Sequence, residues 1–165
     1  MKIIINFFQD KNLVYVFLDK TAQFQSSSFY ARGLHTGSED DVYWSNEKLV
    51  YHTAMLNTGN HYNASTGEYT CPTTGVYVFT YSVFGFNIKQ SGILVAASLY
   101  QDGLEVSQVF HANHNSQNTY ITLSQTDVVH CKGGQRVWVQ SPHIYNRILG
   151  VSVRNMFGGV LLYSA

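Results

Sequence analysis

Between Gly75 and Val83, large aromatic residues alternate with small or β-branched ones. The aromatic positions are Tyr77, Phe79 and Tyr81. Successive side chains of a β-strand point to opposite faces of the sheet, so this period of two predicts a strand with one aromatic face and one smaller face. An aromatic face carries a large apolar area that must be buried. The chain is therefore predicted to fold around a β-sheet with an aromatic core.

Strand patterns recur along much of the remaining chain. They cover Ile93–Tyr100, Glu105–Phe110, Thr119–Leu123, Asp127–Cys131, Arg136–Gln140 and Val160–Tyr163. The pairs Asp102-Gly103 and Gly133-Gly134 tolerate positive φ, and each separates two of these segments as a turn would. A helix is an alternative only for Ser45–Leu56, where the β-branched residues still favour a strand. Many short strands and only two Pro predict an all-β sandwich of two antiparallel sheets.

Composition restricts the partners of this sandwich. A chain of 165 residues has the size of one domain. Its aromatic content of 15% argues against disorder, because disordered chains are poor in aromatic residues. Ten basic and ten acidic residues cancel, and no basic run exists to contact nucleic acid. No apolar stretch reaches the length of a membrane span. We therefore expect neither nucleic-acid binding nor membrane insertion.

The first 28 residues differ from the rest of the chain. Two apolar runs, Ile3–Phe8 and Leu13–Leu18, flank a short polar stretch. They favour a partner-facing or non-native extension, and a hairpin added to the sandwich is the alternative. The first run begins like a signal peptide, but it ends before a hydrophobic region of the usual length forms. We expect an extension over residues 1–28, a domain over residues 29–165, and no recognisable signal peptide.

Two cysteines, Cys71 and Cys131, permit at most one intrachain disulfide, so the fold is not built on disulfides. Each lies in an apolar strand pattern. Both a bridge and two buried free thiols fit these positions. We favour free thiols, because unpaired cysteine is commonly buried.

The strongest motif lies between Tyr51 and Tyr81. Its positions are Tyr51, Asn57, Tyr62, Tyr69, Gly75, Tyr77, Phe79 and Tyr81. The pattern resembles the signature of the complement C1q-like globular domain, with Tyr at Tyr51 and Tyr69 where that family usually has Phe. We interpret these residues as structural, with the rings in the core and Gly75 where a side chain would obstruct the entry of the strand.

Three later segments resemble the same family in the same order. They are Ser98–Gly103, Gly134–Gln140 and Phe157–Tyr163. The resemblance spans Phe29–Ala165 and is greatest to the stalkless C1q-domain proteins of invertebrates, molluscs especially. It implies the jelly-roll sandwich shared by C1q and tumour-necrosis-factor proteins, assembled as a homotrimer that buries an apolar stripe along its threefold axis. Without a collagen-like run, the globular head itself is expected to carry the function.

A polar segment between two strand patterns contains His111, His114 and Asn115. The spacing of the two His is compatible with a metal site, but no carboxylate or Cys lies close to them in sequence. An exposed loop is the simplest interpretation. A loop that contacts a ligand is the functional alternative.

A second candidate loop extends over Ser141–Asn155 and contains Tyr145, Asn146 and Arg147. Long loops on a rigid scaffold often carry binding groups. The Tyr ring can stack on the apolar face of a sugar, while Asn and Arg supply hydrogen bonds. The alternative is a loop packed at a subunit interface.

Calcium prefers hard oxygen ligands such as carboxylates, and the resemblance implies that calcium binds near the trimer axis in many relatives. Here only Asp102 matches an acidic position of the family. The segment Gly85–Gly92, which should contribute to that region, has no Asp or Glu. We therefore predict no cofactor and keep calcium at Asp102 as the alternative.

Asn63-Ala64-Ser65 is an N-glycosylation sequon, which matters if the chain is secreted. No nucleophile elbow or phosphate-binding glycine loop is present in the sequence, so we expect no enzymatic activity. The resemblance implies a secreted, lectin-like module of innate immunity. Such a trimer would bind glycans, lipopolysaccharide or other microbial surface ligands multivalently. The alternative is a receptor-binding ligand or extracellular scaffold of cerebellin or cytokine type.

Overall fold

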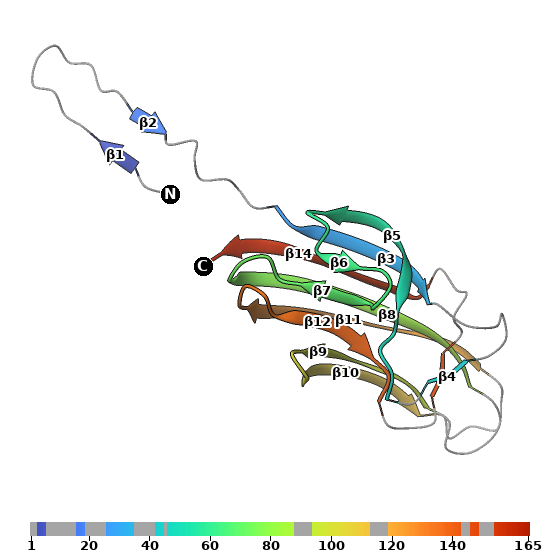
Figure 1. Cartoon of the computed structure of the whole chain (residues 1–165). Coiled ribbons are helices and arrows are strands. Elements are labelled where there is room, and N and C mark those ends of the chain that lie inside the picture. Colours follow the sequence, from blue (N-terminus) through green and yellow to red (C-terminus); the bar gives the residue numbers. More distant parts are fainter. Residues whose placement is uncertain are drawn as a thin grey trace, which may run out of the picture.

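The computed structural model describes residues 3–5, 16–18, 26–34, 42–44, 46–87, 94–112, 119–142, 146–148 and 154–165. All regular structure in these ranges is β (Figure 1). The strands are β1 (Ile3–Ile5), β2 (Val16–Leu18), β3 (Ser28–Leu34), β4 (Val42–Trp44), β5 (Tyr51–Thr58), β6 (Tyr62–Asn63), β7 (Glu68–Thr70), β8 (Gly75–Asn87), β9 (Leu94–Gln101), β10 (Leu104–Ala112), β11 (Thr119–Cys131), β12 (Arg136–Gln140), β13 (Asn146–Ile148) and β14 (Met156–Ser164). Within the described ranges, no helix could cross a membrane.

Ten of these strands form two antiparallel layers of five. The first sheet has the order β5-β3-β14-β8-β11, and the second has the order β6-β7-β12-β9-β10. The short strand β13 joins the layers at one end, because Ile148 pairs with Gly85 of β8 and Asn146 pairs with Leu94 of β9. The predicted all-β jelly-roll sandwich of two antiparallel sheets is confirmed.

Aromatic rings fill the space between the two sheets. The fully buried members are Tyr51, Tyr69, Tyr77, Phe79, Tyr81 and Phe157. Phe29 of β3 stacks on both Tyr62 and Tyr69 with ring centroids 4.7 Å apart. A side chain at Gly75 would collide with the carbonyl oxygen of Tyr163, so glycine is required by the close approach of β14.

The strand boundaries differ from the sequence prediction most in β14 and β11, and the predicted Val160–Tyr163 is only part of β14. The segments Thr119–Leu123 and Asp127–Cys131 belong to one continuous strand, β11, which pairs with β8 along its whole length. The segment considered as a helix contains β5, so the strand interpretation is confirmed from Tyr51 onward. Asp102 and Gly103 both have positive φ and form the β9–β10 turn, whereas Gly133-Gly134 connects strands that lie in different sheets.

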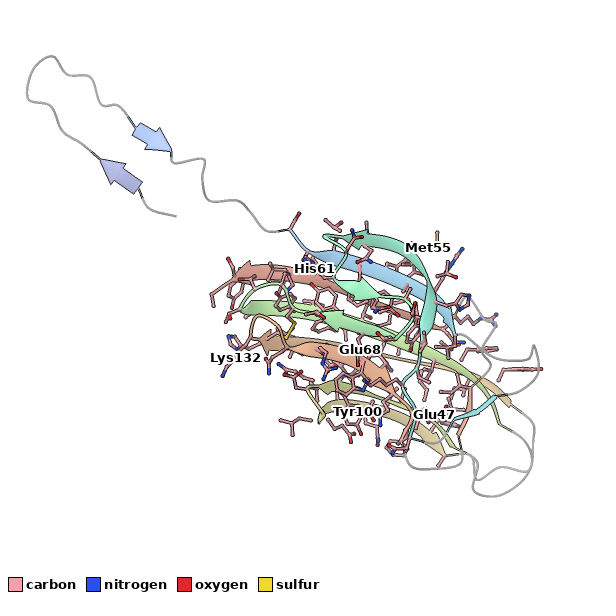
Figure 2. All side chains as sticks on the ribbon, in the orientation of Figure 1. Glu47, Met55, His61, Glu68, Tyr100 and Lys132 are labelled. Atoms are coloured by element: carbon pink, nitrogen blue, oxygen red, sulfur yellow. A yellow bond between two sulfur atoms is a disulfide. The ribbon has the colours of Figure 1, made fainter. Side chains whose placement is uncertain are left out.

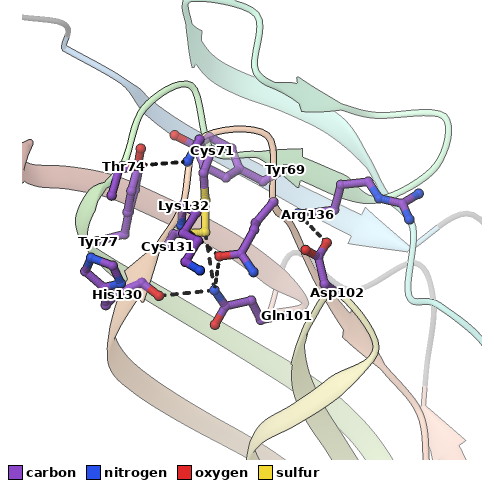
Figure 3. Close-up of a disulfide and its surroundings, with 12 residues drawn as sticks. Tyr69, Cys71, Thr74, Tyr77, Gln101, Asp102, His130, Cys131, Lys132 and Arg136 are labelled. Carbon is purple, nitrogen blue, oxygen red and sulfur yellow. Dashed lines mark hydrogen bonds between the residues drawn. A yellow bond between two sulfur atoms is a disulfide. The ribbon is translucent and has the colours of Figure 1, made fainter.

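The preference for free thiols is wrong, because Cys71 and Cys131 form a disulfide (Figure 3). Both cysteines are fully buried. Strand periodicity placed each one in apolar surroundings but could not show that β7 and β11 end side by side. Gln101 Nε2 donates to Gln135 Oε1 at 2.8 Å beside the bridge, and Cys71 N donates to the Gln135 carbonyl at 2.9 Å.

The N-terminal strands β1 and β2 pair with each other and form a separate two-stranded sheet. The register places Ile3 opposite Leu18 and Ile5 opposite Val16. The alternative for this segment was a hairpin added to the sandwich. β1 and β2 do pair with each other, but in the described ranges they do not extend either five-stranded sheet. A separate extension over residues 1–28 remains a proposal.

Candidate functional site

The strand ends that carry the sequence-predicted ligand residues converge at one end of the sandwich. β9 begins there, and His111 of β10 pairs with Val95 on one side of it. On the other side of β9, Asn146 of β13 pairs with Leu94 and with Trp44 of β4. We call this edge, defined by His111, Leu94 and Asn146, the loop end. The sequence analysis placed His111 and Asn146 in loops, but His111 lies in β10 and Asn146 in β13, on either side of β9.

Backbone pairing fixes the position of the loop end. Ile148 of β13 is fully buried, so the strand that carries Asn146 and Arg147 is anchored in the core. Arg147 pairs with Tyr43 of β4. His111 is half-buried. The remaining predicted ligand residues, His114, Asn115 and Tyr145, lie outside the described ranges.

Asp102 lies at the opposite end of β9, in the β9–β10 turn. At about 3.3 Å per residue, the eight residues of β9 separate it from the loop end by more than 20 Å. One of its carboxylate oxygens accepts a hydrogen bond from Arg136 N at 2.9 Å, which fixes the start of β12. Among the described residues, no three His, Cys, Asp or Glu side chains are grouped to hold a metal.

Exposed apolar side chains gather on one side of the molecule, which we call the apolar side. Its members lie on the outer face of the first sheet, on β11 and β14, and are Val128, Val160, Leu162 and Tyr163. β11 and β14 flank β8 in the first sheet. Asp127 is the only Asp, Glu, Lys or Arg in β8, β11 and β14. Large, uncharged and apolar surfaces mark interaction sites.

Near the loop end, away from the apolar side, the outer face of the first sheet carries an aromatic stack that the sequence analysis missed. Tyr120 stacks on Phe84 with centroids 5.7 Å apart, and the Arg154 guanidinium lies 4.6 Å from the Phe84 ring centroid. The Tyr120 side chain is 64% exposed. Extending the strand pattern beyond Val83 would have placed Phe84 on the outward face, opposite the buried rings.

The outer face of the second sheet carries a row of polar residues that satisfy one another, and the exposed Phe110 ring lies on the same face, opposite Ala96 of β9. Glu68, Trp138, Tyr100 and Glu105 lie side by side in register across β7, β12, β9 and β10. The Trp138 and Tyr100 rings stack with centroids 5.9 Å apart, and the Lys48 ammonium lies 4.2 Å from the Trp138 ring centroid. Figure 2 labels Glu68 and Tyr100 on this face.

Charges on this outer face are paired. Lys48 forms a salt bridge with Glu68, and Arg136 Nη1 lies 3.6 Å from the second Glu68 oxygen. Glu105 accepts a hydrogen bond from Ser98 Oγ at 3.2 Å. Partial burial, and then the negative charge of Glu105, raise the pKa of Tyr100. This row stabilises the sheet surface and leaves Trp138 almost wholly covered.

The buried tyrosines do not provide acid–base chemistry near neutral pH. Burial raises the pKa of both Tyr69 and Tyr81 to about 12. Each hydroxyl therefore remains protonated and serves as a hydrogen-bonding group. Tyr77 OH, for example, donates to the Thr73 carbonyl at 2.7 Å.

The C1q domain model matches residues 29–162, which is most of the chain and reaches from β3 to β14. The chain belongs to the C1q domain family. This C1q-domain chain is 29% identical over 117 residues to Protein HP-25 homolog 2 of Bos taurus. The matched region covers 71% of this chain and 51% of that protein. It spans about half the length, or less, of the curated relatives that it matches.

Solved structures share the fold of this C1q domain. The globular domain of zebrafish complement 1qA superposes with a TM-score of 0.58 at 16% identity, covering 85% of this chain and 98% of that chain. Murine APRIL at pH 8.0 superposes with a TM-score of 0.61 at 15% identity, covering 84% and 100%. At these identities the likeness establishes the common sandwich and nothing finer.

Proposed function

We propose that this C1q domain is a secreted, non-enzymatic recognition module that binds glycans or other microbial surface ligands as a homotrimer. The observation that carries this proposal is the loop end, where the strands place His111 and Asn146 on either side of β9 at the same end of the sandwich. A rigid sheet edge that presents several polar loops is a common arrangement for binding sites. Three such ends on one trimer would give avidity to weak sites.

The apolar side supports the trimer. Val128 is 70% exposed and Tyr163 is 60% exposed in the single chain, on strands with almost no charge. Obligate interfaces are more apolar than the general surface and are poor in charged residues at their centres. Burying this side against two further copies would remove these side chains from water, while the polar outer sheet would remain solvated.

The Cys71–Cys131 disulfide supports the extracellular location. Disulfides form and persist in oxidising compartments and are rare in the reducing cytosol. Both cysteines are fully buried, which protects the bridge from exchange. The same argument favours secretion over a cytosolic role.

A glycan and lipopolysaccharide array, probed with and without chelator, tests the binding proposal. Specific signals that a Tyr145→Ala/Arg147→Ala variant loses, with an unchanged thermal midpoint, would support the loop end as the site. The matched control is Lys132→Ala at the disulfide end, which should bind like the parent. A blank array, or unaltered binding by the double variant, would contradict the proposal. Loss of signal with chelator would restore the calcium alternative.

A receptor-binding ligand is the second candidate, and the exposed Tyr120 ring favours it. Tyr and Arg are enriched in the energetically dominant residues of protein interfaces, and Tyr120 lies beside Phe84 and Arg154. A protein receptor would be retained on immobilised trimer in the presence of free sugar. Retention that free sugar abolishes would favour the glycan-binding module instead.

A further inference from the structure

The turn after β6 holds the Asn63 side chain in a defined position. Asn63 Oδ1 accepts a hydrogen bond from Ser65 N at 2.9 Å, and the Asn63 carbonyl accepts from Gly67 N at 2.8 Å. Ala64, between the two polar residues, packs against the hydrophobic core. Because Ala64 points inward, Asn63 and Ser65 are both exposed. The turn is therefore an Asx turn with its two polar side chains outside.

The amide nitrogen of Asn63 is available for chemistry. Only Oδ1 of this side chain takes part in a hydrogen bond within the described residues. The Nδ2 group therefore faces solvent with its donors unused by the protein. Asn57 provides a contrast, because its Nδ2 donates to the Tyr62 carbonyl at 2.8 Å and its Oδ1 accepts from Tyr62 N. The Asn57 side chain is therefore used within the fold, whereas the Asn63 amide nitrogen is exposed.

We propose that Asn63 carries an N-linked glycan. Asn63-Ala64-Ser65 is the only Asn-X-Ser/Thr sequence of the chain, and its middle residue is not Pro. In the transfer, Asn63 Nδ2 forms a bond to the anomeric carbon of a lipid-linked oligosaccharide. The bond from that carbon to the lipid diphosphate breaks, the diphosphate leaves with the electron pair, and one Nδ2 proton passes to the transferase base. No oxidant or reductant is needed.

The position of Asn63 directs this glycan away from the apolar side. Asn63 pairs with Glu68, and Glu68 continues in register to Trp138 on the polar outer face of the second sheet. β6 is the edge strand of that sheet, and no further strand in the described ranges covers it. The apolar side lies on β11 and β14, which belong to the first sheet. A glycan on Asn63 would cover an open sheet edge and would leave trimer contacts free.

This inference rests on the proposed extracellular location, so the experiment supplies that location itself. The full chain is directed into the secretory pathway of a eukaryotic cell by a cleavable signal sequence, and its mass is measured before and after peptide-N-glycosidase treatment. We expect one glycosidase-sensitive increment, and enzymatic release should convert the Asn63 amide to a carboxylate. Glycosylation is thereby scored separately from ligand binding and native secretion.

Three variants distinguish the site from its surroundings. Asn63→Gln and Ser65→Ala should both abolish the increment, and Ser65→Ala keeps the residue-65 N–H that completes the turn. Thr66→Ala, at the next exposed position, should retain it. An unmodified parent chain in which Cys71 and Cys131 are disulfide-bonded would overturn the proposal, because the bridge reports entry into the oxidising compartment. An increment that persists in Ser65→Ala would also overturn it.

Discussion

At the scale of single residues, this core accommodates tyrosine because its hydroxyls find partners. Tyr62 OH donates to the Tyr51 carbonyl at 2.9 Å, and Tyr81 OH lies 3.3 Å from Ser107 Oγ. Tyr69 OH lies 2.5 Å from Ser27 Oγ. A buried hydroxyl without a partner would cost free energy, so each ring is placed with its polar end at the margin of the apolar layer.

Truncating a central ring tests this core. Phe79 is fully buried and stacks on Tyr77, with ring centroids 5.9 Å apart. Phe79→Ala should lower the free energy of unfolding by about 3–5 kcal/mol, because the cavity cannot close completely. Met55→Ala removes a large apolar side chain that is 54% exposed, and its effect should stay within about 0.5 kcal/mol. Urea denaturation measures both, and equal effects would contradict the assigned core.

Alkaline pH should destabilise the fold through the buried hydroxyls. Burial raises the pKa of Tyr69 and Tyr81 to about 12, against about 10 in an unfolded chain. Between these values the unfolded chain binds fewer protons than the folded one, so stability falls as pH rises. The free energy of unfolding should be constant below about pH 10 and should fall toward pH 12. Tyr81→Phe should reduce this slope, and a flat profile in the parent would contradict the argument.

At the scale of elements, strands with strong local patterns could be predicted, and features that depend on long-range register could not. Arg136–Gln140 was predicted with its observed bounds, because Val137 and Val139 alternate with outward residues. The disulfide was missed because two apolar strand patterns do not reveal that their ends meet. β13 was missed because a three-residue strand is too short to show a period of two.

The disulfide should contribute measurably to stability. Cys71 and Cys131 are 60 residues apart, and closing a loop of this length restricts the unfolded chain by an amount worth about 4 kcal/mol at most. A Cys71→Ala/Cys131→Ala variant should therefore lose about 2–4 kcal/mol in urea denaturation. A thiol assay should find no reactive cysteine in the unfolded, unreduced parent. Two reactive thiols per chain would contradict the bridge.

At the scale of the whole molecule, the two faces of the sandwich have different chemistry. The second sheet presents paired charges around Glu68, whereas the apolar side presents uncharged residues such as Val128. The sequence analysis singled out two candidate loops because polar residues interrupt the strand patterns there. It did not indicate the Phe84–Tyr120 stack, because the outward face of a strand becomes visible only when its length and neighbours are known.

A charge on the apolar side should dissociate the proposed trimer. Val128→Glu would bury an unpaired carboxylate in the interface, which should weaken assembly by at least about tenfold, since about 1.4 kcal/mol corresponds to that factor. Thr70→Glu introduces the same charge on β7 of the outer sheet and should leave assembly unchanged. Sedimentation equilibrium at micromolar concentration measures both. A monomeric parent, or a trimeric Val128→Glu variant, would contradict the interface.

The disulfide and the tight β9–β10 turn stand at one end of the sandwich, while His111 and Asn146 stand at the other. Because the disulfide and the turn are remote from the loop end, we expect substitutions at the loop end to cost little folding stability. A library randomised at His111, Tyr145 and Arg147 should therefore yield mostly folded members with altered ligand preference. In evolutionary terms, the same arrangement allows one stable scaffold to diversify into many specificities.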